Sequence, residues 1–244
     1  MMNVLKSTFL LSAIAAGITL SLSSCEDNFV RGRGDVLTET RSVSTFDAVE
    51  VHDDIEVYLS QGPAEDIRVE GQGNVLDVLQ TKVENRELEI KFKNFVNVGK
   101  HEPVRVYITN PVLTSLQVSG AGRAEGRTDW KVKDLELRIP GSGRMILNLP
   151  EANRIDSKIS GSGNMQIGGN GQSHDIEISG SGDVRAFDLT INRADVRISG
   201  SGNCEMTVTE NLSARVSGSG NIRYRGNPSV STNISGSGKV TKVD

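Results

Sequence analysis

The chain has 244 residues, of which 36% are hydrophobic, 24% charged and 4% aromatic, and its formal net charge is −4. This composition excludes intrinsic disorder, a coiled coil, a polytopic membrane protein and a disulfide-stapled mini-domain. The sequence also contains no run of lysine or arginine residues that would neutralise a phosphate backbone, so it gives no indication of nucleic-acid binding.

The first 24 residues predict a signal peptide. Lys6 provides a positive charge, and an uninterrupted apolar stretch follows from Phe9 to Leu22. A membrane-spanning helix needs about 20 residues, so this stretch is too short to be one. The sequence Leu22-Ser23-Ser24-Cys25 resembles the bacterial lipobox, which implies cleavage before Cys25, a diacylglycerol on its sulfur and an acylated amino group. The alternative is an ordinary cleaved signal followed by a chance cysteine.

The lipobox predicts that a membrane is the first partner of the protein, because two or more acyl chains give stable anchoring. We expect an outer-membrane lipoprotein that faces either the periplasm or the cell exterior. Glu26 and Asp27, directly after the cysteine, resemble a surface-export signal of some Gram-negative groups. With Cys25 lipidated, Cys204 has no intramolecular partner, and its apolar position in a repeat predicts a buried side chain.

Residues 25–41 have no hydrophobic periodicity and predict a flexible tether between the lipid and the fold. From Phe46 onward, apolar residues occupy every second position in several segments, which is the period of a half-buried strand. One short helix at most is expected, near Asn74 to Thr81, with Asn74 as its cap. The predicted strands include residues 49–51, 55–59, 67–69, 88–92 and 104–108.

A sequence repeat occupies the C-terminal half of the chain. Seven short units, most of them Ser-Gly-Ser-Gly, recur there at a nearly constant spacing. An aliphatic residue directly precedes each unit, and a nonpolar residue follows it by two positions. Equivalent apolar residues at a fixed period of about 20 residues are typical of a solenoid, in which each turn contacts only its neighbours. The units begin at Ser119, Pro140, Ser160, Ser179, Ser199, Ser217 and Ser235.

The period-2 alternation inside each repeat predicts that the solenoid is built from strands, with parallel coils about 4.8 Å apart. The serines of the units are expected outside, as a row of hydroxyl groups. The residue after each unit is expected to form a polar row, for which calcium binding is the alternative to simple stacking. The predicted interior column contains Ile159, Ile178, Ile198, Val216 and Ile234, and the polar row contains Asn164, Asp183, Asn203 and Asn221.

The glycines of the units have two alternative explanations. They either allow the backbone to turn a corner, where glycine reaches positive φ without penalty, or they mark a place where the interior is too thin for side chains. The sequence does not separate the two.

No catalytic, cofactor-binding or metal-binding residue is predicted. His52, His101 and His174 have no metal ligand three or four residues away and are expected on the surface. The repeated serines have no repeated histidine to act as a base. The acidic pair Asp53-Asp54 is expected to lie in a solvated turn. Exposed aromatic platforms for carbohydrate are only weakly indicated, because Tyr58, Tyr107, Trp130 and Tyr224 are scattered along the sequence.

The chain resembles the family called putative auto-transporter adhesin, head GIN domain, over about residues 42–241. The resemblance implies a right-handed, single-stranded parallel β-helix on a lipoprotein or secreted protein, and it brings no established catalytic residues. The residues that carry it are Phe46–Val51, Ile55–Gly62, Leu88–Phe92, Val104–Pro111, Leu113–Gly122 and the later Ser-Gly-Ser-Gly units.

We therefore expect a signal peptide at residues 1–24, a tether at 25–41 and a single all-β domain at 42–244. This domain should comprise an irregular β region at 42–118, which caps one end, and Gly-Ser-Gly repeats at 119–244 with about 18–21 residues per coil. Terminal coils of a solenoid are normally atypical, which is why the irregular region is expected to be a cap.

The leading functional hypothesis is a non-enzymatic binding or adhesion module of the cell envelope, with a polysaccharide or another envelope protein as partner. One alternative is an envelope structural or stress-related protein that self-assembles through its open last coil near Gly236–Asp244. Another is a polysaccharide-cleaving β-helix enzyme. The regular spacing of the repeats leaves no room for long loops, so the cleft of such an enzyme is expected within residues 42–118.

Overall fold

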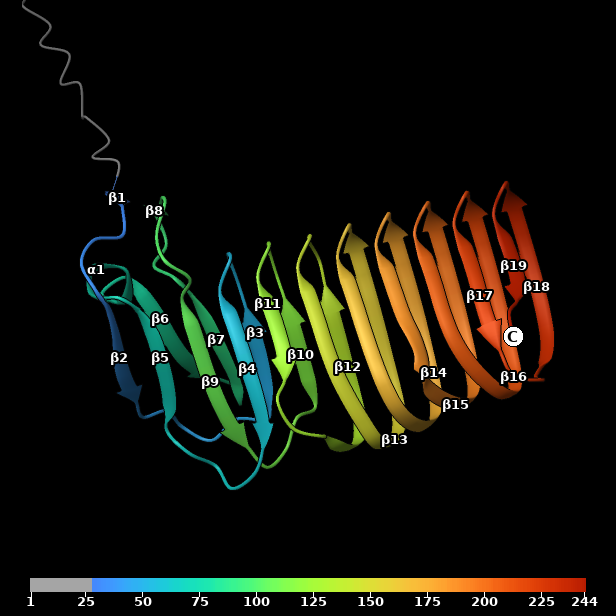
Figure 1. Cartoon of the computed structure of the whole chain (residues 1–244), viewed down its shortest axis with the longest axis horizontal. Helices are drawn as coiled ribbons and strands as arrows, with labels where there is room; N and C mark the ends of the chain where they lie inside the picture. Colours follow the sequence, from blue (N-terminus) through green and yellow to red (C-terminus); the bar gives the residue numbers. More distant parts are fainter. Residues whose placement is uncertain (1–27) are drawn as a thin grey trace, which may run out of the picture.

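The repeats stack as parallel coils of a β-solenoid in the computed structural model, which describes residues 28–244 (Figure 1). The predicted signal peptide and Cys25 lie outside the described residues. Each regular coil is one long strand that runs down one face of the solenoid, bends, and returns along the other face to a Gly-Ser-Gly unit. These long strands are β13 (Arg144–Gly161), β14 (Asn164–Gly180), β15 (Asp183–Gly200) and β16 (Asn203–Gly218).

The parallel register places equivalent residues of the repeats in columns, as the sequence predicts. Ile159 pairs with Ile178, Ile178 with Ile198 and Ile198 with Val216. The same column ends at Ile234 in the last coil. Its residues are buried except for Ile234, because no further coil covers that end. A second column contains Ala124, Met145, Met165, Val184, Cys204, Ile222 and Val240.

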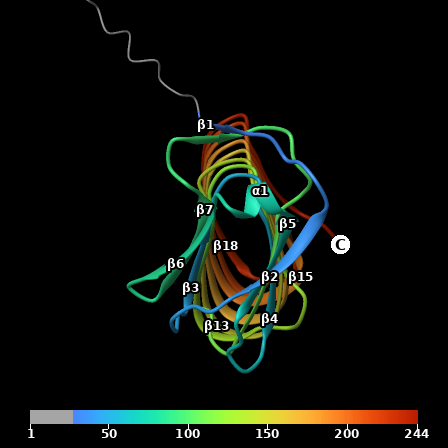
Figure 2. The same cartoon turned by 90° about the vertical axis from the view of Figure 1, so that its left-hand side faces the viewer.

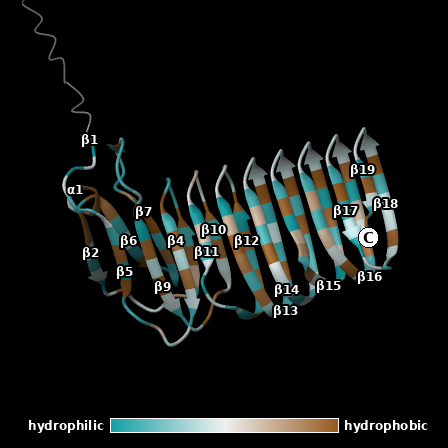
Figure 3. Ribbon diagram, in the orientation of Figure 1, coloured by the Kyte–Doolittle hydropathy of each residue, from teal (hydrophilic) through white to brown (hydrophobic). Residues whose placement is uncertain are grey.

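The alternation of hydropathy along each strand accounts for the burial of these columns, because successive side chains of a strand point to opposite faces (Figure 3). The remaining strands of the regular part are shorter. They are β10 (Ser115–Val118), β11 (Arg123–Gly126), β12 (Lys131–Ile139), β17 (Asn221–Arg225), β18 (Ser229–Gly236) and β19 (Lys239–Lys242).

The first and second glycines of each unit have different roles, so both sequence-based explanations apply. The first glycine turns the corner: Gly180 has φ of 124°. The second glycine is buried at a thin part of the interior. A Cβ atom on Gly182 would lie 2.5 Å from Ile159 Cγ2 and 2.7 Å from the carbonyl oxygen of Gly163 in the preceding coil.

The solenoid begins before the Gly-Ser-Gly repeats, and its first coils are out of sequence order. β3 (Ala48–Val51) and β4 (Glu56–Gln61) pair with β10 and β11 on one side and with β7 (Glu87–Phe92) and β9 (Arg105–Asn110) on the other. The chain therefore forms an inner coil first, returns to the end to form an outer coil, and then continues past both at β10 (Figure 1).

Asp53 occupies the corner of this early coil at the position of a first glycine. The register that pairs Val51 with Val118 places Asp53 beside Gly120. Asp53 has a positive φ of 60°, which aspartate tolerates better than most residues, and its carboxylate accepts a hydrogen bond from the Phe92 backbone N–H at 3.0 Å. The acidic pair Asp53-Asp54 thus forms a coil corner, in keeping with the predicted turn.

The N-terminal end of the solenoid is closed, as predicted, by a small cap (Figure 2). β5 (Ile67–Gln72) pairs antiparallel with β9 and with β2 (Val36–Arg41), and β6 (Leu79–Glu84) pairs antiparallel with β7. The helix α1 (Gly73–Leu76) buries Val75 and Leu76 at this end. No helix of the described residues is long and apolar enough to span a membrane.

Two sequence-based predictions about this end are wrong. Residues 28–41 are not a tether: β1 (Asn28–Val30) pairs with β8 (Val96–Val98), and β2 belongs to the main sheet. Asn74 does not cap the helix. Its side chain instead bonds the backbone of the N-terminal segment, at Arg31 O and Arg33 N, so the short helix fixes that segment to the cap.

Candidate functional site

The candidate site lies on the face of the solenoid that carries the serine row, which we call the serine face. Its outward residues come from β12, from the C-terminal halves of β13 to β16, and from β18. The first serines of successive units are paired in register and exposed, as predicted from the sequence. They are Ser160, Ser179, Ser199, Ser217 and Ser235.

A groove of about 510 Å³ runs across four coils of the serine face. The serine row forms one side of it. A row of mostly charged residues, two positions earlier on each strand, forms the other side. A second groove, of about 350 Å³, adjoins it and shares Glu177 and Arg197. The catalytic cleft of the alternative enzyme was expected within residues 42–118, whereas these two grooves lie on the repeat coils. The charged row contains Glu177, Arg197, Arg215 and Asn233.

Ion pairs between neighbouring coils order the charges of the serine face. Lys158 Nζ lies 3.0 Å from Glu177 Oε2, and Arg215 Nη1 lies 3.0 Å from Asp195 Oδ2. Arg154 contacts Asp156 at 3.0 Å and Asp175 at 2.8 Å. Such exposed pairs contribute little to stability, so their main effect is to hold these charged side chains in place.

The carboxyl group of Asp175 lies among three other charged groups on this face. Burial raises its pKa above the usual aspartate value, and the neighbouring Asp156 and Asp195 add to this effect. The guanidinium of Arg154 opposes the shift but does not cancel it. The first groove therefore offers hydroxyl groups and charged side chains, and the second adds a carboxyl group, that of Asp175, whose pKa is raised.

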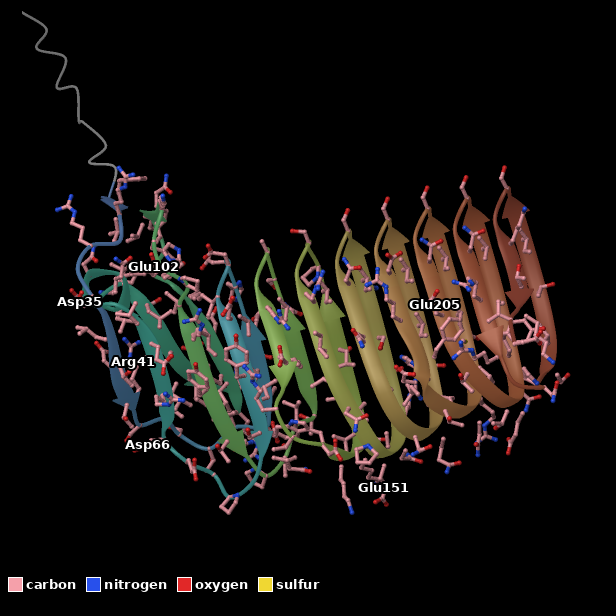
Figure 4. The ribbon with its side chains drawn as sticks, viewed as in Figure 1. Asp35, Arg41, Asp66, Glu102, Glu151 and Glu205 are labelled. Carbon is pink, nitrogen blue, oxygen red and sulfur yellow. The ribbon has the colours of Figure 1, made fainter. Side chains whose placement is uncertain are left out.

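The opposite face carries the predicted polar row. Asn203 Nδ2 donates to Asp183 Oδ1 at 3.0 Å, and Asn221 Nδ2 donates to Asn203 Oδ1 at 3.1 Å. Next to this row, Arg223 pairs with Glu205 at 2.7 Å, and Figure 4 labels Glu205 among the outward side chains of the coils. Asn203 and Asn221 thus bond the preceding coil directly, whereas Asn164 donates to the Ser162 carbonyl oxygen of its own coil at 3.4 Å.

Two tyrosines that are far apart in the sequence form an aromatic stack. Tyr58 on β4 is paired in register with Tyr107 on β9, and their ring centroids are 5.2 Å apart. Arg127 covers the outer face of the Tyr58 ring at 4.1 Å, and Arg68 covers that of Tyr107 at 3.9 Å. The stack is thus closed at both ends by arginines. Sequence spacing did not reveal it, because the out-of-order coils bring the two strands together.

The expected surface position is wrong for His174 and His101. His174 is completely buried, and its Nε2 lies 2.8 Å from the hydroxyl of Ser157 in the preceding coil. Burial lowers the pKa of His174 to about 3, so the ring is neutral at physiological pH. The side chain of His101 is only 6% exposed. The Ser157–His174 pair has the atoms of a nucleophile and a base, but it is enclosed in the core and serves packing.

His52 belongs to a cluster with Glu50 and Glu89. Its Nε2 lies 3.3 Å from Glu50 Oε1 and 3.5 Å from Glu89 Oε1, and all three residues offer ligand atoms within 4.8 Å of one another. Zinc binds imidazole and carboxylate groups of this kind. However, Glu89 already pairs with Lys91 at 2.7 Å, and Glu50 accepts a hydrogen bond from Gln117. These internal contacts account for the cluster.

Cys204 is buried in the second interior column, as predicted. Burial raises the pKa of its thiol far above the ordinary value, and the nearby Glu205 raises it further. Burial therefore disfavours the thiolate, the form that redox or metal chemistry needs.

Stacked parallel coils, closed at one end and lined with regular polar rows and an open groove, define a β-solenoid that displays a repetitive surface. Residues 45–228 match the family described as "Putative auto-transporter adhesin, head GIN domain", and the chain belongs to this family. The resemblance seen in the sequence is confirmed. No curated protein matches the chain.

Several solved bacterial structures share the fold. A putative adhesin from Bacteroides fragilis is 21% identical, with a TM-score of 0.83, and the match covers 88% of this chain and 100% of that one. A putative lipid binding protein from Parabacteroides distasonis is 24% identical, with a TM-score of 0.75 and the same coverage. A putative adhesin from the same organism is 29% identical, with a TM-score of 0.69 and again the same coverage.

Proposed function

We propose that this protein is a non-enzymatic lipoprotein of the cell envelope whose serine face binds an extended, repetitive partner, in the first place a polysaccharide. The groove that crosses successive coils carries the proposal. Its rows repeat at the coil spacing of about 4.8 Å, so a serine hydroxyl recurs at each coil beside a long polar or charged side chain. A partner that is itself repetitive meets equivalent groups at each step, and many weak contacts add up to stable binding.

The family and the fold support a binding role. Adhesin is the word used for the family and for two of the similar structures, and a surface or envelope location fits it. The similar Parabacteroides distasonis structure is named a lipid binding protein, so a lipid or another envelope protein is also a partner to be tested.

The chemistry of the serine face favours binding over catalysis. A cleaving enzyme needs free acids and bases that converge on one bond. In the first groove, the carboxylate of Glu177 contacts Lys158, and in the second, those of Asp156 and Asp175 both contact Arg154. These carboxylates are thus held in ion pairs with basic side chains along the surface.

The proposal is tested by measuring binding to a glycan array beside a degradation assay with the same polysaccharides. Ser199→Tyr places a large side chain in the groove and is expected to abolish binding. Arg144→Tyr places the same side chain at an exposed position of the other face and is expected to leave binding unchanged. Equal loss in both variants would contradict the assignment to the serine face, and turnover of a polysaccharide would contradict the non-enzymatic role.

The anchor has a separate test. Labelling with palmitate is expected to depend on Cys25, and Cys25→Ser is expected to release the protein from the membrane fraction. Retention of the variant in that fraction would contradict the lipid anchor. Protease treatment of intact cells then distinguishes the cell surface from the periplasmic face of the outer membrane.

Self-assembly is a second candidate, and the open C-terminal coil is the observation that favours it. The residues of β18 are all exposed, including Val230 and Ile234, and only one edge of this strand is paired. Unpaired edges of this kind associate with other strands. Oligomers that form with increasing concentration in sedimentation, without binding to any glycan, would favour this candidate.

A further inference from the structure

One corner of the N-terminal cap projects beyond the coils at the place where the chain enters the fold (Figures 1 and 2). It consists of β1 with residues 31–34 and of β8 with the residues on either side of it. β1 and β8 pair in parallel, and Asn28 lies opposite Val96. The start of β1, which points back toward Cys25, is therefore next to the residue that precedes β8, and this residue is Phe95. We call residues 28–34 and 93–100 the entry corner.

Phe95, directly before β8, is displayed to solvent. It is 96% exposed, and its φ of 63° lies in the left-handed region that large residues normally avoid. Phe29, on the paired strand, is 57% exposed, and its ring lies over Gly99. Two exposed aromatic rings on one small corner are costly in water, whereas aromatic rings are favoured at the interface of a membrane.

The charge of the entry corner is opposite to that of the chain. Its two segments contain four basic residues and no acidic residue, a net charge of +4, whereas the whole chain has −4. No ion pair joins the four basic side chains to any residue between 28 and 244, although Lys93 donates to a backbone carbonyl at 2.7 Å. The acidic residues that flank the two segments in the sequence are Glu26, Asp27, Asp35 and Glu102. The four basic residues are Arg31, Arg33, Lys93 and Lys100.

The backbone of the entry corner is fixed to the cap. Asn74 bonds both sides of the turn at Arg31 and Arg33, and Gly32 N donates to Lys100 O at 3.1 Å. The exposed rings and charges are therefore held in place by the fold, so they are presented together to whatever surface faces them.

The position of Cys25 in the sequence indicates which surface the entry corner faces. Only Glu26 and Asp27 separate it from Asn28, so a fully extended chain spans about 10 Å between Cys25 and the first strand. We propose that the entry corner rests on an anionic lipid bilayer, with Phe95 inserted among the headgroups and the four basic residues against lipid phosphates. The inference builds on the proposed lipid anchor, because the anchor brings this corner to the membrane.

The test uses the intrinsic fluorescence of a Phe95→Trp variant of the full-length protein purified from bacterial membranes. The variant is mixed with vesicles of phosphatidylcholine and phosphatidylglycerol whose acyl chains are brominated, since bromine quenches a tryptophan that it contacts. The single native tryptophan, Trp130, is completely buried and supplies a constant background. The matched control is Val230→Trp at the opposite end of the solenoid, where Val230 is also exposed.

We expect the emission of the Phe95→Trp variant to shift to shorter wavelength and to be quenched, and that of the Val230→Trp variant to stay unchanged. Adding Lys100→Glu is expected to reduce affinity for the anionic vesicles by roughly fivefold or more, because each basic residue near the surface contributes about 1 kcal/mol. Lys133→Glu, the same charge change at an exposed position of β12, is expected to have little effect.

Unchanged emission of the Phe95→Trp variant with excess vesicles would overturn the inference, as would equal quenching of the two tryptophan variants. Equal binding to vesicles of phosphatidylcholine alone would overturn the role of the basic residues. Flotation of the protein with the vesicles reports separately on the lipid anchor. If the protein does not float, the anchor fails, and the emission in excess vesicles still decides whether the corner binds lipid.

Discussion

The two glycines of a repeat unit are required for different physical reasons, and only the second depends on the interior. A side chain on a first glycine such as Gly180 is strained by its backbone angle and would also meet the backbone of the preceding coil, whereas a side chain on a second glycine such as Gly182 would in addition meet an interior side chain, Ile159. The serine between them points to solvent, so neither the backbone angle nor the preceding coil restricts its side chain. This difference makes adjacent positions of one unit a sensitive comparison.

We expect Gly182→Ala to destabilise the protein by about 1–3 kcal/mol, the range for overpacking a well-packed core. The added methyl group would meet the Gly163 carbonyl oxygen, which belongs to the backbone and cannot move aside. Ser181→Ala, one residue earlier, is exposed and should change stability by less than about 0.5 kcal/mol. Unfolding in urea measures both. Equal stability of the two variants would mean that the interior is not tight at this position.

His174 gives the fold a dependence on pH. Its pKa is about 3 in the folded state and about 6.5 when exposed, so the unfolded chain binds the additional proton between these values. Stability is complete above pH 6.5 and falls as the pH decreases toward 3. We expect a loss of about 2–3 kcal/mol between pH 7 and pH 4.5 from this residue.

His174→Gln should remove this part of the pH dependence, because glutamine does not titrate. Urea unfolding from pH 7 to pH 4.5 measures the effect as the difference between the wild-type and variant profiles. His52→Gln, at a half-exposed position, is the control for general effects of removing a histidine. Parallel profiles of the wild type and His174→Gln would show that the histidine is hydrated in the folded state.

At the scale of elements, the sequence predicted where the strands lie, but in the N-terminal part it did not predict which strands pair with each other. Alternation determines which side chains point inward, and the repeat fixes the register wherever Gly-Ser-Gly units recur. Between residues 42 and 118 no such unit exists, and Asp53 replaces a corner glycine. Pairing between β3 and β7 then depends on long-range contacts that no local pattern records. The same is true of β1, whose partner β8 is a short strand far along the chain, on the other side of β2 to β7.

The interior column offers a test of how each coil supports the next. Ile198→Ala is expected to cost about 2–5 kcal/mol, because its side chain is 2% exposed and lies between two coils. Ile234→Ala removes the same atoms from the same column in the last coil, where the residue is 41% exposed, and should cost less than about 1 kcal/mol. Unfolding in urea measures both. Similar losses would indicate that another surface covers the last coil in solution.

For the whole molecule, the sequence predicted the rows of the candidate site but not the grooves between them. The rows follow from the repeat period, since equivalent residues stack. The depth of a groove depends on the lengths of side chains from several coils, such as the short Ser199 beside the long Arg197 and Arg215. The tyrosine stack and the entry corner both depend on the coil order of the cap, which explains why the sequence did not reveal them.

The two ends of the molecule differ, and this difference predicts where it opens. The N-terminal coils are covered by α1 and by antiparallel strands, whereas β18 is paired along only one edge and is exposed throughout. In a solenoid, each coil is stabilised mainly by its neighbours, so a coil with one neighbour should open most easily. We expect amide hydrogen exchange, followed by mass spectrometry of peptides, to be fastest in β18 and β19 and slowest in β14 and β15.

A dilution series at fixed pH extends this measurement to self-assembly. If the last coil is free, the exchange rate of β18 should be the same at every protein concentration. Protection of β18 that appears only at high concentration would indicate pairing between open edges, because association covers the unpaired strand. Protection of β18 equal to that of β14 at all concentrations would contradict the expected order, since it would require the last coil to be as well supported as a central one.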